Sequence, residues 1–556
     1  MKMVKSLLLG SAAGLVAVAG AQAADLPVKA KPVEYVKICS LYGEGFFYIP
    51  GTDTCIKIGG WVRAEAVTNA GGSFSEFLAG TGGRNDRIDS KDINLRARTV
   101  ISFDVRTQTE YGTLRAYYRN GFELTTDAQG GGQGTYYTER AFIQFAGFTF
   151  GKSQSYFDFY NGVFGYGLSY LGGGGSNTGA SGTILFAYTA QFGSGFSATI
   201  SAEDNTYRRN AVWDAGTNAL AIGAFPGPGG WTPVGYATCG INTVTPDLNA
   251  AIPAGAGNPA LVGCATGDYA AEQIPDIIGA LRVDQAWGSA QIAGALHQIR
   301  SGYYGNNIGT ALPEVGPSGY TGIAPTDKFG WAVMGGVLLN LPWNAGDKLW
   351  VESAYTVGAP AYAGCSQTGV NGTFLRFSGN TVGQGQCLDA LFANTVGPAV
   401  GSGIGAPTAP SGNQLTTVWT VAAAIEHYWT PAVRSDLFAS YMKTEYNAIA
   451  TNIYCSSPVG AVRTAAGAAP NFLTGAVAGC NPDFAVYGIG LRTIWNPVKN
   501  LDVGFEVMYA KLDQNMNPNT VLLNYGGGGG RVPGLYIPAD QETWSGGIRI
   551  QRNFWP

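Results

Sequence analysis

Polar and apolar residues alternate along several segments of the chain. In NLRARTVISFDVR, positions 94 to 106, the even positions carry mostly polar or charged side chains, such as Arg98 and Asp104, and the odd positions mostly apolar ones. Successive side chains of a β-strand point to opposite faces, so this stretch is predicted to be a strand with one charged and one apolar face. Two environments fit it: a soluble sandwich, whose apolar face packs in a core, and a transmembrane barrel, whose apolar face meets lipid.

The same alternation predicts strands near both ends of the chain. The approximate ranges are 55–66, 92–106 and 113–124, and then 484–495, 501–512 and 542–554. In the last strand Trp544, Ile548, Ile550 and Phe554 form an apolar face, opposite Ser545, Arg549, Gln551 and Asn553. A closing strand with an apolar outer face that ends in Phe is typical of barrels that an outer-membrane assembly machinery folds.

Short and long connections alternate between the predicted strands. Seven short links with turn residues, such as TQTEYG at 107–112, are separated by long stretches rich in Gly, Ala, Pro and Asn, the longest at about 205–275 and 358–414. Seven links that each join two strands, with one further strand at each end, give sixteen strands, and bacterial outer-membrane barrels have an even number. We therefore predict an all-β fold, a transmembrane antiparallel β-barrel with short periplasmic turns and long external loops.

The start of the chain indicates export. Lys2 and Lys5 precede a short apolar run and an Ala-Gln-Ala site at 21–23, the form of a secretory signal peptide, so residues 1–23 are predicted to be cleaved. Residues 24–54 are then an N-terminal periplasmic segment and residues 55–554 the barrel. After Ala24 no apolar run approaches the roughly 20 residues of a spanning helix.

Composition favours the barrel over a soluble sandwich. Charged residues make up 13% of the chain and Gly 83 of 556 residues, against about 25% and 7% in ordinary soluble domains. The 29 Tyr and 26 Phe suit aromatic girdles at two membrane interfaces. Without Lys2 and Lys5 the chain has 31 basic and 37 acidic residues, and no basic stripe indicates nucleic-acid binding.

The eight cysteines lie as neighbours in the sequence. The candidate pairs are Cys39 with Cys55, Cys239 with Cys264, Cys365 with Cys387, and Cys455 with Cys480. Their spacings match no C-x-x-C metal or redox pattern, and export makes disulfides the natural interpretation, with free buried thiols as the alternative.

The segment from Ala24 to Glu65 resembles the start of the alphaproteobacterial general porins, the rhizobial-type outer-membrane porins. YIPGTDTCIKIGG, SYFDFYNGVFGYG and the IRIQRNF terminus extend the likeness along the chain. The resemblance implies a homotrimer of sixteen-stranded barrels in the Gram-negative outer membrane, surrounded by lipid and lipopolysaccharide. It also implies a third external loop folded into each pore, and no cofactor or metal. One departure is that Trp555 and Pro556 follow the terminal Phe.

The third long connection, about 154–182, is the candidate constriction loop. It holds five Tyr or Phe before Gly165 and one acidic residue, Asp158. An exposed loop this aromatic would be an adhesive patch, so we expect it to fold inward. The alternatives are an aromatic cap at the lipid interface and a trimer contact.

Charge pairing suggests a register for the second and third strands. With Arg106 opposite Thr113, Asp104 faces Arg115 and Arg96 faces Glu123, whereas a slide by two residues brings two arginines face to face. In this register Arg98 and Arg119 have no partner directly opposite. We expect these two, with Arg63 and Lys57, to form a basic wall facing Asp158 and to give a weak anion preference; the alternative is that they only solvate the lining.

The function predicted is passive diffusion of small hydrophilic solutes and ions. An enzyme is not supported, because the two histidines, His297 and His427, are not placed for a Ser–His dyad and no catalytic motif occurs in a convincing context. A siderophore transporter would need a plug domain, for which about 31 residues before Cys55 are too few. A sugar-type specific channel and a secreted β-adhesin remain as alternatives.

Overall fold

The computed structural model describes most of the chain, apart from the first 36 residues and parts of the long connections. The described residues are 37–69, 93–126, 134–159, 164–171, 175–176, 178–206, 208–214, 269–270, 272–302, 324–365, 373–393, 411–455, 462–464, 477–525 and 534–555. The predicted signal peptide therefore lies outside them.

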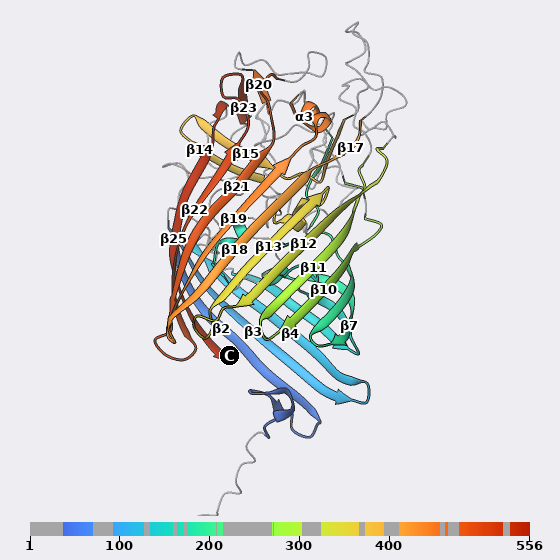
Figure 1. Ribbon diagram of the computed structural model, residues 1–556, viewed down its shortest axis with the longest axis vertical. Coiled ribbons are helices and arrows are strands. Elements are labelled where there is room, and N and C mark those ends of the chain that lie inside the picture. Colours follow the sequence, from blue (N-terminus) through green and yellow to red (C-terminus); the bar gives the residue numbers. More distant parts are fainter. Residues whose placement is uncertain are drawn as a thin grey trace, which may run out of the picture.

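Sixteen antiparallel strands close into a barrel, as predicted (Figure 1). Each strand pairs with its neighbours along the barrel, and the last pairs with the first, so the barrel has no open edge. In chain order the strands are β2 (Thr54–Thr68), β3 (Ile93–Thr109), β4 (Gly112–Thr125), β5 (Thr135–Phe145), β6 (Phe148–Ser153), β7 (Thr183–Gly193), β8 (Phe196–Glu203), β10 (Asp276–Gln285), β11 (Gly288–Ile299), β12 (Lys328–Asn340), β13 (Lys348–Val357), β18 (Thr417–Thr430), β19 (Val433–Glu445), β21 (Phe484–Trp495), β22 (Leu501–Gln514) and β25 (Gln541–Trp555).

The two faces of each strand meet different surroundings. On β3, Leu95 and Ile101 point outward and are 48% and 38% exposed, whereas Arg96 and Asp104 point inward and are buried. The outer face of the last strand exposes Trp544 in the same way. This charged interior and apolar exterior are what a lipid-facing barrel requires.

Short turns gather at one end of the barrel and long connections at the other (Figure 1). The seven predicted short links are all present, and β21 has the predicted bounds, 484–495. β6 ends at Ser153 and β7 begins at Thr183, so the third long connection also spans the predicted residues, 154–182.

The long connections carry structure of their own above the barrel. A five-stranded sheet contains β14 (Thr373–Ser378), β15 (Thr381–Gln386), β24 (Gly534–Pro538), β23 (Val521–Tyr525) and β20 (Val462–Thr464). A three-stranded sheet contains β17 (Ser411–Leu415), β16 (Ala390–Ala393) and β9 (Val212–Asp214), and helix α3 (Ala448–Cys455) lies beside them. The described helices are all too short or too polar to cross a membrane.

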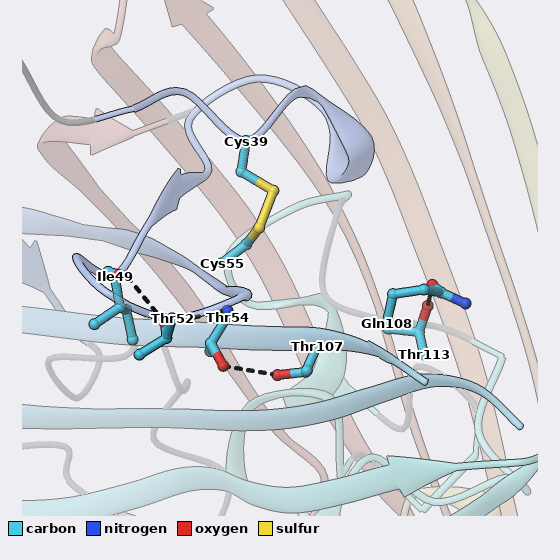
Figure 2. The surroundings of a disulfide bond; sticks show 8 residues. All are labelled: Cys39, Ile49, Thr52, Thr54, Cys55, Thr107, Gln108 and Thr113. Carbon is cyan, nitrogen blue, oxygen red and sulfur yellow. Dashed lines mark hydrogen bonds between the residues drawn. A yellow bond between two sulfur atoms is a disulfide. The ribbon is translucent and has the colours of Figure 1, made fainter. Parts of the chain in front are cut away.

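At the opposite end, the N-terminal loop, residues 37–53, sits against the start of β2. It contains η1 (Ser40–Tyr42) and β1 (Phe47–Tyr48), and β1 pairs with β2. The Cys39–Cys55 disulfide ties this loop to the barrel, close to the hydrogen bond that joins Thr54 of β2 to Thr107 of β3 (Figure 2).

Candidate functional site

The connection 154–182, here called loop 3, folds into the barrel in the parts that the structure describes, as predicted. Its apolar side chains Phe157, Phe164 and Leu168 are at most 2% exposed and belong to one core with the inner face of the wall. That part of the wall is rich in small residues, among them Ala293, Ala332, Ala354, Ala422 and Ala424. Because alanines leave space inside the barrel, the loop packs closely on this side.

Hydrogen bonds fix the loop backbone to three distant strands. Gln291 of β11 donates to the carbonyl of Phe157 at 3.2 Å, and Ser440 of β19 donates to the carbonyl of Leu171 at 2.6 Å. The carboxylate of Glu506 on β22 accepts from the backbone N–H of Gly167 at 2.8 Å and from that of Tyr166. Loop 3 therefore lies against the wall from β11 to β22.

Asp158 holds the two halves of loop 3 together. Its carboxylate accepts from the hydroxyl of Ser176 at 2.8 Å and from the backbone N–H of Thr178 at 2.7 Å, and also from the Ser176 N–H and the Thr178 hydroxyl. The residue is 6% exposed, so these four bonds turn it toward its own loop. It also lies within electrostatic range of Arg140 on β5.

The predicted register of β3 and β4 is wrong. The strands pair two residues further along, so that Arg98 faces Glu123 and Arg106 faces Arg115. The hairpin closes through a two-residue turn, Glu110 and Tyr111, a connection that hairpins favour, and the strands therefore extend into the predicted turn. In the same hairpin Thr113 donates to Gln108 at 3.1 Å, next to the turn (Figure 2).

The like charges that argued against this register are neutralised by one carboxylate. Arg106 and Arg115 each donate two hydrogen bonds to Asp104, at 2.8 to 2.9 Å. Such forked bonds to a carboxylate are strong, so the shared Asp104 offsets the repulsion between the two arginines.

The structure also corrects the expectation that Arg98 and Arg119 lack partners. Arg98 lies 3.3 Å from a carboxylate oxygen of Glu123 and 3.6 Å from one of Glu139, and Arg119 lies 2.6 Å from the other oxygen of Glu139. Both arginines do line the interior beside Arg63 of β2. We call Lys57, Arg63, Arg98 and Arg119 the basic wall.

Arginines and glutamates alternate across the seam of the barrel. Glu65 of β2 accepts from the Nε atoms of Arg96 on β3 and Arg549 on β25, both at 2.5 Å. Arg96 also lies 3.4 Å from Glu123, which joins this cluster to Arg98. The basic wall is thus part of a larger ladder in which Arg96 and Arg549 add to the cations and Glu65, Glu123 and Glu139 supply the acids.

A β-bulge places Glu139, which the sequence analysis did not identify. Arg119 pairs with Arg140 but the next residue, Asn120, pairs with Thr138, so Glu139 is the extra residue. A bulge changes the parity of a strand, and here both Glu139 and Arg140 point inward, where a regular strand would turn one of them outward. The only signal in the sequence is a break in alternation within TERAF.

Three of the four predicted disulfides are present. Cys39–Cys55, Cys365–Cys387 and Cys455–Cys480 pair as nearest neighbours. The fourth predicted pair, Cys239 with Cys264, lies outside the described residues.

A buried charged cluster joins the long connections to loop 3. His297 Nδ1 lies 2.8 Å from Asp276 Oδ1, and the Tyr362 hydroxyl donates to Asp276 Oδ2 at 2.6 Å. The Tyr362 ring packs edge-on against Phe157 of loop 3, with centroids 4.7 Å apart, and burial raises the pKa of this tyrosine well above its usual value. Within the described residues, no group of three or more Asp, Glu, His or Cys is arranged to hold a metal ion.

Comparison with known proteins identifies the family. A model of the porin subfamily matches residues 25–542. The chain belongs to the porin subfamily. It is an outer-membrane channel of the Gram-negative type, and family membership indicates a channel rather than an enzyme.

Curated relatives of this porin come from alphaproteobacteria. Porin Omp2a of Brucella ovis is 35% identical over 253 residues, which are 41% of this chain and 67% of the relative. Porin Omp2b of Brucella suis is 36% identical over 208 residues, which are 36% of this chain and 52% of the relative. The matched stretches thus span about two thirds and about half of these relatives.

Solved structures similar to this porin are also outer-membrane channels. The channel DcaP of Acinetobacter baumannii has a TM-score of 0.48 at 14% identity and covers 91% of this chain and 99% of its own. An anion-selective porin from Comamonas acidovorans has a TM-score of 0.38 at 10% identity, covering 90% of this chain and 100% of its own.

Proposed function

We propose that this porin forms a passive, water-filled channel for small hydrophilic solutes and ions, and that the lumen between loop 3 and the basic wall sets its selectivity. The observation that carries the proposal is the asymmetric interior: loop 3 packs on the alanine-rich side, and the ladder of arginines and glutamates lines the other. No cofactor and no energy input are needed for diffusion through such a channel.

The ladder favours a weak anion preference. Arg63, Arg96, Arg98, Arg119 and Arg549 outnumber Glu65, Glu123 and Glu139, and Lys57, nearer the short-turn end of β2, stands opposite Asp104. Asp158 is the acid that loop 3 contributes, but its bonds to Ser176 and Thr178 hold it within the loop. Fields fall off over about 8 to 10 Å at physiological salt, so the local excess of cations governs permeating ions more than the net charge of the chain does.

A sugar-type specific channel is less well supported. It would need aromatic rings along the pore, and Phe157, Phe159 and Phe164 of loop 3 are instead at most 9% exposed, packed against the wall. The curated relatives are named as porins, and they do not favour the sugar-type alternative.

The assembled state belongs to the same proposal. We propose a homotrimer in the outer membrane, inserted by the barrel assembly machinery and surrounded by lipid and lipopolysaccharide, after cleavage of residues 1–23. Residues 24–54 are proposed to stay on the periplasmic side. A gel-mobility shift between unheated and heated samples tests the trimer, and a single band at the monomer position in both would contradict it.

The reversal potential across a salt gradient tests the selectivity. The native channel should show a small anion preference at low salt, and Arg98→Ser with Arg119→Ser should shift it toward cations, because Glu139 loses both partners. Lys443→Ser is a suitable control, since this lysine lies on β19 between the inward-facing Met442 and Thr444 and so points out of the lumen. A strongly cation-selective native channel, or no shift in the double variant, would contradict the placement of the basic wall.

A further inference from the structure

A cavity of about 440 Å³ lies at the short-turn end of the lumen. Its walls come from the inner faces of β2, β3 and β4, and two rings from the N-terminal loop complete it. The residues on which the inference rests are Lys57, Arg106, Arg115, Arg119, Tyr42 and Phe46. We call this cavity the vestibule.

The vestibule is strongly cationic. Its lining contains four basic side chains and a single carboxylate, Asp104. The side chains of Arg106, Arg115 and Arg119 remain 26%, 27% and 34% exposed, so their charges face water in the cavity. Asp104 balances one of the positive charges, and Glu139 lies close to Arg119. The cavity therefore keeps a positive excess.

Aromatic rings of the N-terminal loop lie over Arg106 and Lys57. The Arg106 guanidinium lies 4.9 Å from the centre of the Phe46 ring and 5.5 Å from that of Tyr42, and the Lys57 ammonium lies 5.8 Å from that of Phe46. A ring that stacks on a guanidinium occupies its face, so N–H groups at the edge stay directed into the cavity. Arg106 donates two of its five N–H groups to Asp104, and the others are not used by that carboxylate.

A disulfide and a backbone hydrogen bond hold the N-terminal loop, which carries these rings, in a fixed conformation. The Cys39–Cys55 disulfide closes it, and Cys39 N–H donates to the Phe46 carbonyl at 2.9 Å (Figure 2 shows the disulfide). The Tyr42 hydroxyl is buried, and among the described residues no group forms a hydrogen bond with it. This hydroxyl is closed to water, so Tyr42 contributes its ring, which stacks on Arg106, and not its oxygen.

We propose that the vestibule binds small multivalent oxyanions, solutes with phosphate or carboxylate groups, as they cross the pore. Arginine forks match the geometry of these groups, whereas chloride can use only their charge. The volume is near the lower end of the range for small-molecule sites, which suits a compact solute. This inference rests on the proposed channel function and adds a class of solute to it.

Single-channel recording in a planar bilayer tests the site. Native trimers in potassium chloride are titrated with inorganic pyrophosphate in one arm and with citrate in the other, and each arm is expected to lower the open-channel current in a saturable way. The ratio of the two half-blocking concentrations shows whether phosphate or carboxylate groups are preferred. Saturable block by neither anion overturns the proposal.

Two variants test whether the anions that block the current bind in the vestibule. Lys57→Gln should raise the half-blocking concentration about tenfold, the effect of one lost charge-assisted contact. Cys39→Ser with Cys55→Ser should also raise the half-blocking concentration, because the rings that position Arg106 and Lys57 are released. Lys443→Gln removes a charge outside the lumen and should leave it unchanged.

The outcomes separate this site from the channel function itself. Conductance in potassium chloride alone measures the channel, so trimers that fail to conduct contradict the proposed function. A conducting channel that pyrophosphate and citrate block equally in the native protein and in Lys57→Gln contradicts only the vestibule.

Discussion

Glu65 is expected to stabilise the seam where the last strand meets the first. Its carboxylate accepts from Arg96 on one side and Arg549 on the other, lies 3.9 Å from Arg63, and is fully buried. We predict that Glu65→Gln lowers the free energy of unfolding by about 3 kcal/mol. The three guanidinium groups would then repel one another without the negative charge that neutralises them.

The magnitude follows from burial. Removing one partner of a buried ion pair costs about 3 to 5 kcal/mol, and the lower end applies because glutamine keeps a carbonyl acceptor and the shape of the side chain. Glu123→Gln is the matched control. Glu123 contacts Arg96 and Arg98 at 3.4 and 3.3 Å, but its side chain is 24% exposed, so solvent screening limits the expected cost to below about 1 kcal/mol.

Equilibrium unfolding of both variants in urea, with folded barrel measured by gel mobility and tryptophan fluorescence, gives the comparison. Glu65→Gln should unfold at clearly lower urea than native protein, and Glu123→Gln close to native. In planar bilayers, the reversal potential of Glu65→Gln should be shifted toward anions, since the ladder loses one negative charge. Equal midpoints for the two variants would refute the reasoning about the seam.

Three further predictions concern loop 3, the bulge and the disulfides. Asp158→Ala should increase open-channel current noise, because it removes the four hydrogen bonds that join Asp158 to Ser176 and Thr178. Ser176→Ala removes one of these bonds and should increase the noise less. Equal noise in native and Asp158→Ala channels would show that Asp158 does not hold the loop together. Glu139→Gln should shift the reversal potential toward anions because Arg98 and Arg119 share this carboxylate, and an unchanged potential would remove Glu139 from the constriction. Peptide mapping of unreduced protein by mass spectrometry should find Cys239 linked to Cys264 besides the three pairs described, and a linkage between different loops would contradict nearest-neighbour pairing.

The parts of the structure that the sequence predicts are those with a local signal. Alternation with period two gives the strands and their faces, and turn residues locate the short links, so even the bounds of loop 3 follow from the chain. The register of β3 and β4 could not be predicted from opposing charges alone, because Asp104 pairs with Arg106 on its own strand and diagonally with Arg115, which makes the rejected register favourable. Glu139 was missed because a bulge leaves only a brief break in the pattern. The external sheets pair residues far apart in sequence, such as β15 with β24, which no local pattern reports.

The alanine-rich floor beneath loop 3 means that pore width can be tuned from positions that no solute touches. Ala293, Ala332 and Ala422 are at most 3% exposed, under the loop. Interiors are close-packed and transmit strain, so a larger side chain at one of these positions would lift the loop toward the arginines instead of filling empty space. Mutations there would change the cutoff size for permeation while leaving the chemistry of the lining intact. Porins that differ in exclusion limit can therefore carry the same visible pore surface.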